Sequence, residues 1–296
     1  MTSAPRRYRS SDEDSARWAD FPVRDGDIVI STRSKSGTTW MQMICALLVF
    51  RTPDLPAALS TLSPWLDWLL VPRDEVFATL AAQRHRRFIK THTPLDGLPS
   101  DDRMTYIVVA RHPLDMAVSL HHQGANLDRA RIRALSGAPA EQFRQTPAPG
   151  PREALLRWID HDVEPARSLD SLPGVMWHLR DAWERRHQPN VLLVHYDDLS
   201  ADLPGEMRRI ADSLDFEVPE ERWPMLVEAA RFASMQARAD RLAPDPAGIM
   251  KDPSAFFRRG TSGSGRELLD AAELDHYRRR AATMAPADLL DWLHRS

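Results

Sequence analysis

Residues 31–40, STRSKSGTTW, bring a lysine, a glycine and several hydroxyl side chains together between an apolar run and a predicted helix. A turn that leaves a strand and opens a helix exposes unpaired backbone N–H groups at the positive end of the helix dipole. Such a turn is suited to binding an anion. The candidate anion ligands are Lys35, Ser36, Gly37, Thr38 and Thr39.

The order of these residues differs from the phosphate loop of ATPases. That signature, G-x-x-x-x-G-K-S/T, has an additional first glycine and places its lysine after the second glycine. Here the first glycine is missing, and Lys35 precedes Gly37. A nucleotide phosphate remains compatible with the turn, but the residues do not require ATP hydrolysis.

A second group of side chains that could take part in a reaction follows another apolar run. His92 comes directly after residues 87–91, at the carboxyl end of a predicted strand, where open α/β sheets place their ligands. A neutral imidazole can take a proton from an alcohol or a phenol near pH 7. Lys90 stands two residues earlier, so an extended chain places it on the same side as His92.

The elements that position these residues can be read from the apolar pattern. Four runs dense in Val, Ile and Leu show little alternation, which is typical of parallel strands buried on both faces. The predicted strands are 27–32, 87–91, 105–110 and 191–196, and the predicted helices are 38–50, 113–122, 174–188, 204–216, 219–232, 267–284 and 286–294. This alternation predicts a single α/β domain over residues 1–296, with a central parallel sheet flanked by helices.

Three segments do not fit that pattern. Residues 1–20 form a predicted polar N-terminal arm, because they lack the apolar stretch of a signal peptide. Residues 136–153 are rich in proline and small polar side chains, and residues 241–265 have no period. Long irregular segments in compact domains are typical of lids and binding loops.

Composition narrows the class of protein. The net charge of −3 favours no nucleic acid partner, so an anion site has to come from local cations such as residues 84–87 or 258–259. The longest apolar run, MQMICALLVF, is about half as long as a membrane-spanning helix needs. The single cysteine, Cys45, is typical of a reducing compartment, so the expected location is the cytoplasm.

Five motifs, in this order along the chain, resemble the sulfotransferases that use 3′-phosphoadenosine 5′-phosphosulfate (PAPS). SKSGTTW resembles their 5′-phosphosulfate loop, Y-P-K-S-G-T-T-W, and FIKTHTPL resembles the segment with their catalytic histidine. YIVVARHPLDMAVSLHH resembles their 3′-phosphate motif, VLLVHYDDL their strand and tyrosine, and FFRRGTSGSGR their R-K-G-x-x-G loop. Within the family, the chain most resembles actinobacterial enzymes that act on glycolipids.

The resemblance implies a P-loop-like sulfotransferase fold and transfer of a sulfuryl group from PAPS to a hydroxyl, releasing 3′,5′-ADP. It implies four catalytic residues, namely His92 as the base, Lys35, Lys90 and Ser119. The implied nucleotide contacts are Lys35, Ser36, Gly37, Thr38, Thr39, Trp40, Arg111, Ser119, Tyr196, Phe232, Phe257, Arg258, Arg259 and Gly260. Since basic residues take the place of Mg²⁺, no metal site is expected.

The sequence also departs from the family pattern. Arg33 and Ser34 replace the tyrosine and proline of the loop, which predicts a change in its rigidity. After Gly263 the usual D-W-K is missing, so we expect weaker ordering of residues 256–266 without ligand. The dimerisation motif of animal members, K-x-x-x-T-V-x-x-x-E, is absent from residues 266–275, so no oligomeric state is predicted.

The acceptor is the part that the sequence describes least. Trp65 and Trp68 within residues 60–72, the 136–153 segment and Trp177 are candidates for an apolar acceptor pocket. Such a wall suits a lipid-like or polycyclic alcohol and also a small phenol. Two other functions stay open: a nucleotide kinase-like phosphotransferase on a similar sheet, and a non-catalytic 3′,5′-ADP-binding protein.

Overall fold

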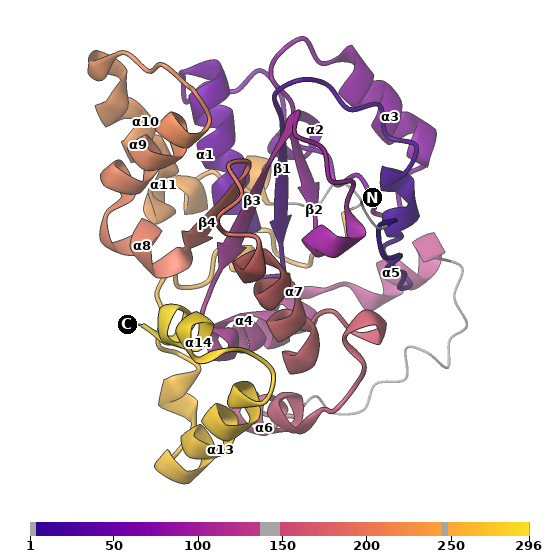
Figure 1. The fold of residues 1–296 in the computed structure, drawn as a ribbon, viewed down its shortest axis with the longest axis vertical. Helices are drawn as coiled ribbons and strands as arrows, with labels where there is room; N and C mark the ends of the chain where they lie inside the picture. The colour runs from indigo at the N-terminus through magenta and orange to yellow at the C-terminus, as the bar shows by residue number, and fades with distance from the viewer. Residues whose placement is uncertain (1–3, 137–148, 244–247, 296) are drawn as a thin grey trace.

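A central sheet of four parallel strands lies between two layers of helices in the computed structural model, which describes residues 4–136, 149–243 and 248–295 (Figure 1). The strands are β1 (Asp27–Thr32), β2 (Phe88–Thr91), β3 (Met104–Ala110) and β4 (Val191–His195), in the spatial order β2-β1-β3-β4. The four strands and the parallel α/β class expected from the apolar runs are confirmed.

The two faces of the sheet contribute to two separate apolar cores. Ile28 and Ile30 of β1 pack into one core, and Val29 between them packs into the other. Successive side chains of a strand point to opposite faces, so a strand covered on both sides is apolar at every position. This is why the strands show no apolar–polar alternation.

Helices from distant parts of the chain cover each face (Figure 1). One face packs against α1 (Thr38–Phe50), α2 (Leu59–Leu62), α8 (Tyr196–Ala201), α9 (Leu203–Ser213), α10 (Trp223–Ala230), α11 (Phe232–Gln236) and α12 (Ala239–Leu242). The other packs against α3 (Arg73–Ala82), α4 (Pro113–Asn126), α6 (Pro151–Asp160), α7 (Leu172–Glu184), α13 (Ala271–Ala282) and α14 (Ala287–His294). The remaining elements are α5 (Arg129–Ser136) and short 3-10 turns at Ser15–Trp18, Leu95–Gly97, Pro165–Arg167, Glu220–Arg222, Ser254–Phe256 and Arg266–Leu268.

Helix ends follow local capping chemistry. Asp270 and Glu273 form a reciprocal capping box, so α13 begins at Ala271 rather than at the predicted 267. Pro151 takes the favoured first position of α6. The helix therefore begins inside the predicted irregular segment 136–153. Residues 137–148 and 244–247 of the two predicted loops lie outside the described residues.

The N-terminal segment packs on the domain instead of extending as a polar arm. Tyr8 and Trp18 are 2% and 1% exposed. The Tyr8 hydroxyl donates to Asp96 at 2.8 Å, and Trp18 Nε1 donates to Asp67 Oδ2 at 3.1 Å. The prediction rested on the lack of an apolar stretch and overlooked these two aromatic anchors, whose rings bury apolar area while their polar atoms keep a partner.

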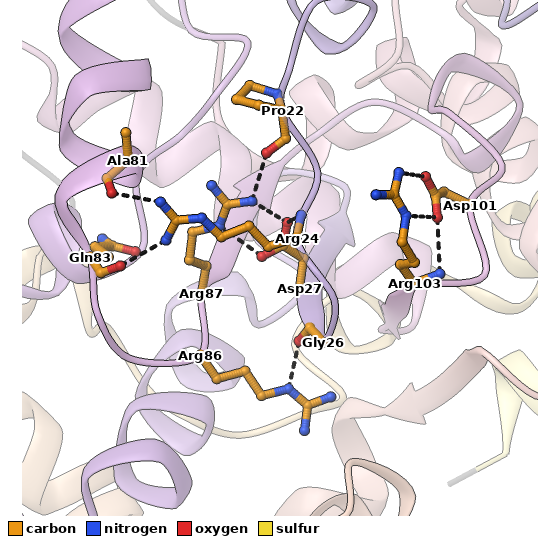
Figure 2. Close-up of polar contacts among 10 residues, drawn as sticks. All are labelled: Pro22, Arg24, Gly26, Asp27, Ala81, Gln83, Arg86, Arg87, Asp101 and Arg103. Atoms are coloured by element: carbon orange, nitrogen blue, oxygen red, sulfur yellow. Dashed lines mark hydrogen bonds and ion pairs between the residues drawn. The ribbon is translucent and has the colours of Figure 1, made fainter.

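Two arginines of the basic cluster at residues 84–87 lie at the amino ends of the strands, away from the predicted site (Figure 2). Arg87 Nε donates to Asp27 Oδ1 at 2.7 Å, and its Nη2 donates to Asp27 Oδ2 and to the Pro22 carbonyl. Arg86 Nε donates to the Gly26 carbonyl at 2.5 Å. Both charges have internal partners, so these two residues do not form an anion site.

Replacing Arg87 with methionine is expected to lower the free energy of unfolding by about 3–5 kcal/mol, measured by urea denaturation. Asp27 is 1% exposed, and the substitution leaves its carboxylate buried without its cation. The matched control is Arg103→Met, which breaks the exposed pair with Asp101 (Figure 2) and should leave the midpoint nearly unchanged because water hydrates both charges. Equal effects of the two substitutions would contradict a stabilising role for the buried pair.

Candidate active site

The carboxyl ends of the strands open onto a cavity of about 580 Å³. The chain crosses from β1 to β2 on one side and from β3 to β4 on the other, so β1 and β3 form a topological switch point. All the predicted site residues except Ser36 line this cavity: Lys35, Gly37, Thr38, Thr39, Trp40, Lys90, His92, Arg111, Ser119, Tyr196, Phe232, Phe257, Arg258, Arg259 and Gly260. Ser36 is buried inside the turn, where its N–H donates to the Arg33 carbonyl at 3.2 Å.

The turn between β1 and α1 has the backbone conformation of an anion site. Lys35 and Gly37 have φ values of 66° and 109°, and Gly37 precedes α1 with no side chain capping the first N–H groups. A Cβ at Gly37 would lie 3.1 Å from the Tyr196 ring, which is tighter than an ordinary contact, and the positive φ would strain any side chain there. The free amides of the first turn of α1 therefore face the cavity with the positive end of the helix dipole.

Lys35 places a cation beside that turn. Its ammonium lies 3.7 Å from the centroid of the Phe256 ring and 3.4 Å from Gln123 Oε1. Burial, followed by repulsion from Arg111 and other cations, lowers the pKa of Lys35 to about 7. A polyanion bound here would favour the charged form, because an opposite charge nearby offsets the cost of burial.

Ser119 lines the cavity from α4, but the described structure records no hydrogen bond between it and Lys35. Lys35 instead donates to Gln123, one helical turn further along α4. Gln123 was not among the predicted residues. Its spacing of four from Ser119 could have signalled it, because residues four apart share a helix face.

His92 is held in a single orientation at the cavity wall. It is 4% exposed, and its Nδ1 hydrogen-bonds to the carbonyl of Thr32. A carbonyl can only accept, so Nδ1 carries the proton and Nε2 keeps a free lone pair. Burial, reinforced by the cations Lys90 and Arg33, holds the pKa of His92 well below 6.5. At neutral pH the residue is therefore a neutral base.

Lys90 lies in a buried charged group next to His92. Its ammonium is 4.0 Å from the centroid of the Trp65 ring. Burial lowers the pKa of Lys90 to about 8, against the opposing carboxylates of Glu13 and Asp67. Burial also raises the pKa of Glu13 to about 8. Sequence reasoning missed both acidic residues, although Asp67 stands as a lone charge between Trp65 and Trp68.

A second cationic group lies across the cavity. The Arg111 guanidinium lies 4.3 Å from the centroid of the Tyr196 ring, and its Nη2 donates to the Thr261 carbonyl at 3.0 Å. The Nε atoms of Arg111 and Arg258 are buried and have no hydrogen-bond partner among the described residues. Buried donors of this kind usually have a partner in folded proteins, which is a ligand, an ion or an ordered water where the chain supplies none. These residues therefore fit a phosphate.

The loop that carries Arg258 is fastened by a buried carboxylate. Asp115, at the start of α4, accepts hydrogen bonds from the N–H of Gly263 at 2.8 Å and of Gly265 at 2.7 Å. Ser262 adds a hydrogen bond to Asp197. The missing D-W-K led us to expect weak ordering of residues 256–266, and these contacts supply an alternative anchor.

Aromatic rings close one end of the cavity. Trp40 Nε1 donates to the Ala230 carbonyl at 2.8 Å, and its ring meets the Tyr196 ring edge-on at 5.1 Å. Phe232 packs on Gly260, where a Cβ would lie 2.4 Å from the ring and φ is 66°. Trp40 and Phe232 thus line one cavity, and their predicted contact with the nucleotide stays a prediction.

The other end of the cavity is mainly apolar. Trp65 and Trp68 stack with centroids 5.4 Å apart. The Trp65 ring also contacts the His92 ring edge-on. Other apolar residues that line the cavity include Leu59, Val71, Leu120, Ile249 and Met250. Trp177 is not part of the lining: its Nε1 donates to the Tyr8 hydroxyl at 2.8 Å. The expectation that Trp177 lines this pocket is wrong, because α7 directs it toward the N-terminal segment.

Within residues 4–136, 149–243 and 248–295, no group of three His, Cys, Asp or Glu side chains is arranged to hold a metal ion. Across the same part of the chain, every helix is too short or too polar to cross a bilayer.

Comparison with known proteins places the chain in a family. The family model described as the sulfotransferase domain matches residues 25–283. The chain belongs to the sulfotransferase family. This sulfotransferase is 44% identical over 306 residues to the glycolipid sulfotransferase of Mycobacterium bovis, covering 97% of this chain and 93% of that one. It is 27% identical to sulfotransferase 1A1 of Rattus norvegicus, covering 90% and 88%.

Solved structures support the same fold for this sulfotransferase. Retinol dehydratase in complex with androsterone and the inactive cofactor PAP aligns with a TM-score of 0.70 at 22% identity, covering 95% of this chain and 85% of that one. Mouse sulfotransferase SULT7A1 complexed with PAP aligns with a TM-score of 0.64 at 19% identity, covering 91% and 87%. At this level of identity the likeness concerns the fold.

Proposed function

We propose that the protein transfers a sulfuryl group from PAPS to a hydroxyl of an acceptor, with His92 as the base. The observation that carries the proposal is the fixed tautomer of His92, which leaves Nε2 free in a residue that lines the same cavity as Lys35. The motifs shared with PAPS-dependent enzymes support it, as do the structural neighbours that were crystallised with PAP.

Each group of residues has one task in this reaction. PAPS, when bound, supplies the sulfuryl group and leaves as 3′,5′-ADP. His92 Nε2 takes the proton from the acceptor hydroxyl, and Lys35 stabilises the negative charge that grows on the leaving phosphate oxygen. The amides at the start of α1 hold the 5′-phosphate, while Arg111 and Arg258 hold the 3′-phosphate. Lys90 contacts the sulfuryl oxygens, and positioning with charge stabilisation supplies most of the catalysis.

For the acceptor we propose a lipid-like alcohol, with glycolipids as the first candidates. The apolar wall around Trp65 and Trp68 suits an acyl or polycyclic group, and the mycobacterial relatives are named glycolipid sulfotransferases. We also propose the cytoplasm as the location, with the single, buried and unbridged Cys45 in support.

Incubation with radiolabelled PAPS and a panel of glycolipids, sterols and phenols tests this function, together with calorimetric titration of 3′,5′-ADP. Transfer to a hydroxyl is the expected result. Tight binding of 3′,5′-ADP without transfer to any acceptor would favour a non-catalytic binding protein. Mg²⁺-dependent ATP binding that excludes 3′-phosphorylated nucleotides would favour a kinase-like enzyme.

The acid limb of the kcat/KM profile is expected below pH 6.5. Only the neutral imidazole of His92 can take a proton, so activity persists while the pH is above its pKa and falls as the pH drops through it. That pKa lies well below 6.5 because of burial and then of Lys90 and Arg33. A pH profile measured with saturating PAPS checks this, and an acid limb above pH 7 would contradict a buried, neutral base.

A further inference from the structure

The two residues that depart from the family's loop pattern share one partner. Arg33 Nη2 donates to Asp170 Oδ1 at 2.7 Å, and Ser34 Oγ donates to Asp170 Oδ2 at 2.9 Å. Each oxygen of one carboxylate therefore holds one of the two substituted positions. Arg33 is only 3% exposed, so its charge needs this partner inside the protein.

Arg33 extends the connection to the predicted base. Its Nη1 donates to the backbone carbonyl of His92. Ser34, at the other oxygen of Asp170, directly precedes Lys35. Through Arg33 and Ser34, the Asp170 carboxylate thus connects the segment that carries the cation of the site to the segment that carries the base.

Asp170 is itself held by two helices. Its carbonyl accepts from Trp158 Nε1 of α6 at 2.8 Å, and the next residue, Ser171, caps the N-terminus of α7. A second contact from α7 reaches the same strand ends: His178 Nε2 lies 3.3 Å from Ser31 Oγ, which donates to the Thr93 carbonyl at 2.7 Å. The carboxylate is therefore attached to a rigid support.

We propose that Asp170 is a positioning residue that holds the Lys35 turn and the His92 segment in register. It gives the turn the rigidity that a proline gives the loop pattern Y-P-K-S-G-T-T-W. Asp170 lies outside the cavity lining of the described residues, so it acts through Arg33 and Ser34 and not on the reacting atoms. The inference rests on the proposed sulfuryl transfer.

Asp170→Asn is expected to lower kcat by about tenfold or more, since small misplacements of reacting groups slow a positioned reaction strongly. The Kd for 3′,5′-ADP should stay within about twofold, because Arg111, Arg258 and the α1 amides are unchanged. Asp181→Asn is the matched control, since Asp181 lies on α7, the helix that begins two residues after Asp170, and pairs with Arg185 at 2.9 Å. The control should keep the kcat of the unmodified protein.

A mutant cycle separates positioning from general support of the fold. Asp170→Ala is introduced into the natural chain and into an Arg33→Tyr/Ser34→Pro background. We expect a loss of kcat of about tenfold or more in the first and of less than about twofold in the second, because the second has no side chains for Asp170 to hold. Equal losses in both backgrounds would overturn the inference.

Two further outcomes of these measurements can be distinguished. If the double-substituted background does not fold, Ser34→Ala replaces it, and its effect on kcat should not add to that of Asp170→Asn. If the natural chain transfers sulfuryl and Asp170→Asn keeps full kcat, the inference fails while the proposed function stands. Absence of transfer by the natural chain to the whole acceptor panel would count against the proposed function itself, and the inference would fail with it.

Discussion

Replacing His92 with alanine is expected to lower kcat by at least about 10²-fold while the Kd for 3′,5′-ADP stays nearly unchanged. The imidazole is the proposed base, and it lines the cavity with Nδ1 held by the Thr32 carbonyl and Nε2 free. Alanine removes the base and leaves the residues of the phosphate sites in place. Single-turnover kinetics with labelled PAPS and calorimetry with 3′,5′-ADP measure the two quantities separately.

His276→Ala is the control for this experiment. His276 lies on α13, is 43% exposed and pairs with Asp160 at the surface, so its loss should leave kcat unchanged. Unchanged turnover in the His92 variant would remove His92 from the reaction. A parallel loss of 3′,5′-ADP binding would instead assign His92 to the structure of the nucleotide site.

The 3′-phosphate of the ligand is expected to contribute a large part of the affinity. In the natural chain, 3′,5′-ADP should bind at least about tenfold more tightly than 5′-AMP, because a charge-assisted hydrogen bond contributes about 1.5–3 kcal/mol. Arg111→Gln should remove most of that difference. The buried Nε of Arg111, without a partner among the described residues, is the structural reason to place the phosphate there.

Calorimetry at one fixed ionic strength tests this prediction, because salt screens such contacts. The affinity for 5′-AMP serves as the internal control: it should survive in Arg111→Gln, which shows that the turn before α1 is intact. Arg103→Gln, an exposed arginine paired with Asp101, is the matched surface control. Equal affinity of the natural chain for 3′,5′-ADP and 5′-AMP would contradict a dedicated 3′-phosphate site and, with it, PAPS as the donor.

Much of the fold and the site could be predicted because the signals are local. The strands form where four apolar runs are buried on both faces, and one-dimensional composition is enough to find them. The carboxyl ends of parallel strands meet at one edge, so residues that directly follow different strands, such as Lys35, His92 and Arg111, were expected together and all line the cavity. Trp65 and Trp68 were likewise placed in the apolar wall.

What remained out of reach depends on contacts between segments far apart in the chain. Arg86 and Arg87 looked like an anion site. Their hydrogen-bond partners, Gly26 and Asp27, lie about sixty residues earlier in the chain and meet them only at the amino end of the sheet. Tyr8 and Trp18 looked like part of a polar arm until packing supplied Asp96 and Asp67 as their partners. The sequence shows which charged and aromatic side chains are present, but it does not show which of them are in contact in the folded chain.

The sequence by itself determined the strands, the turn before α1, the family and most of the candidate site residues, since each of these lies in a short contiguous stretch. Only the tertiary structure decided how those stretches are held in register. Asp115 fastens the loop that carries Arg258, and Asp170 joins the Lys35 turn to the His92 segment. The physical reason is that the pairing of each carboxylate depends on proximity and on the loss of water around the pair, and both arise only when the chain has folded.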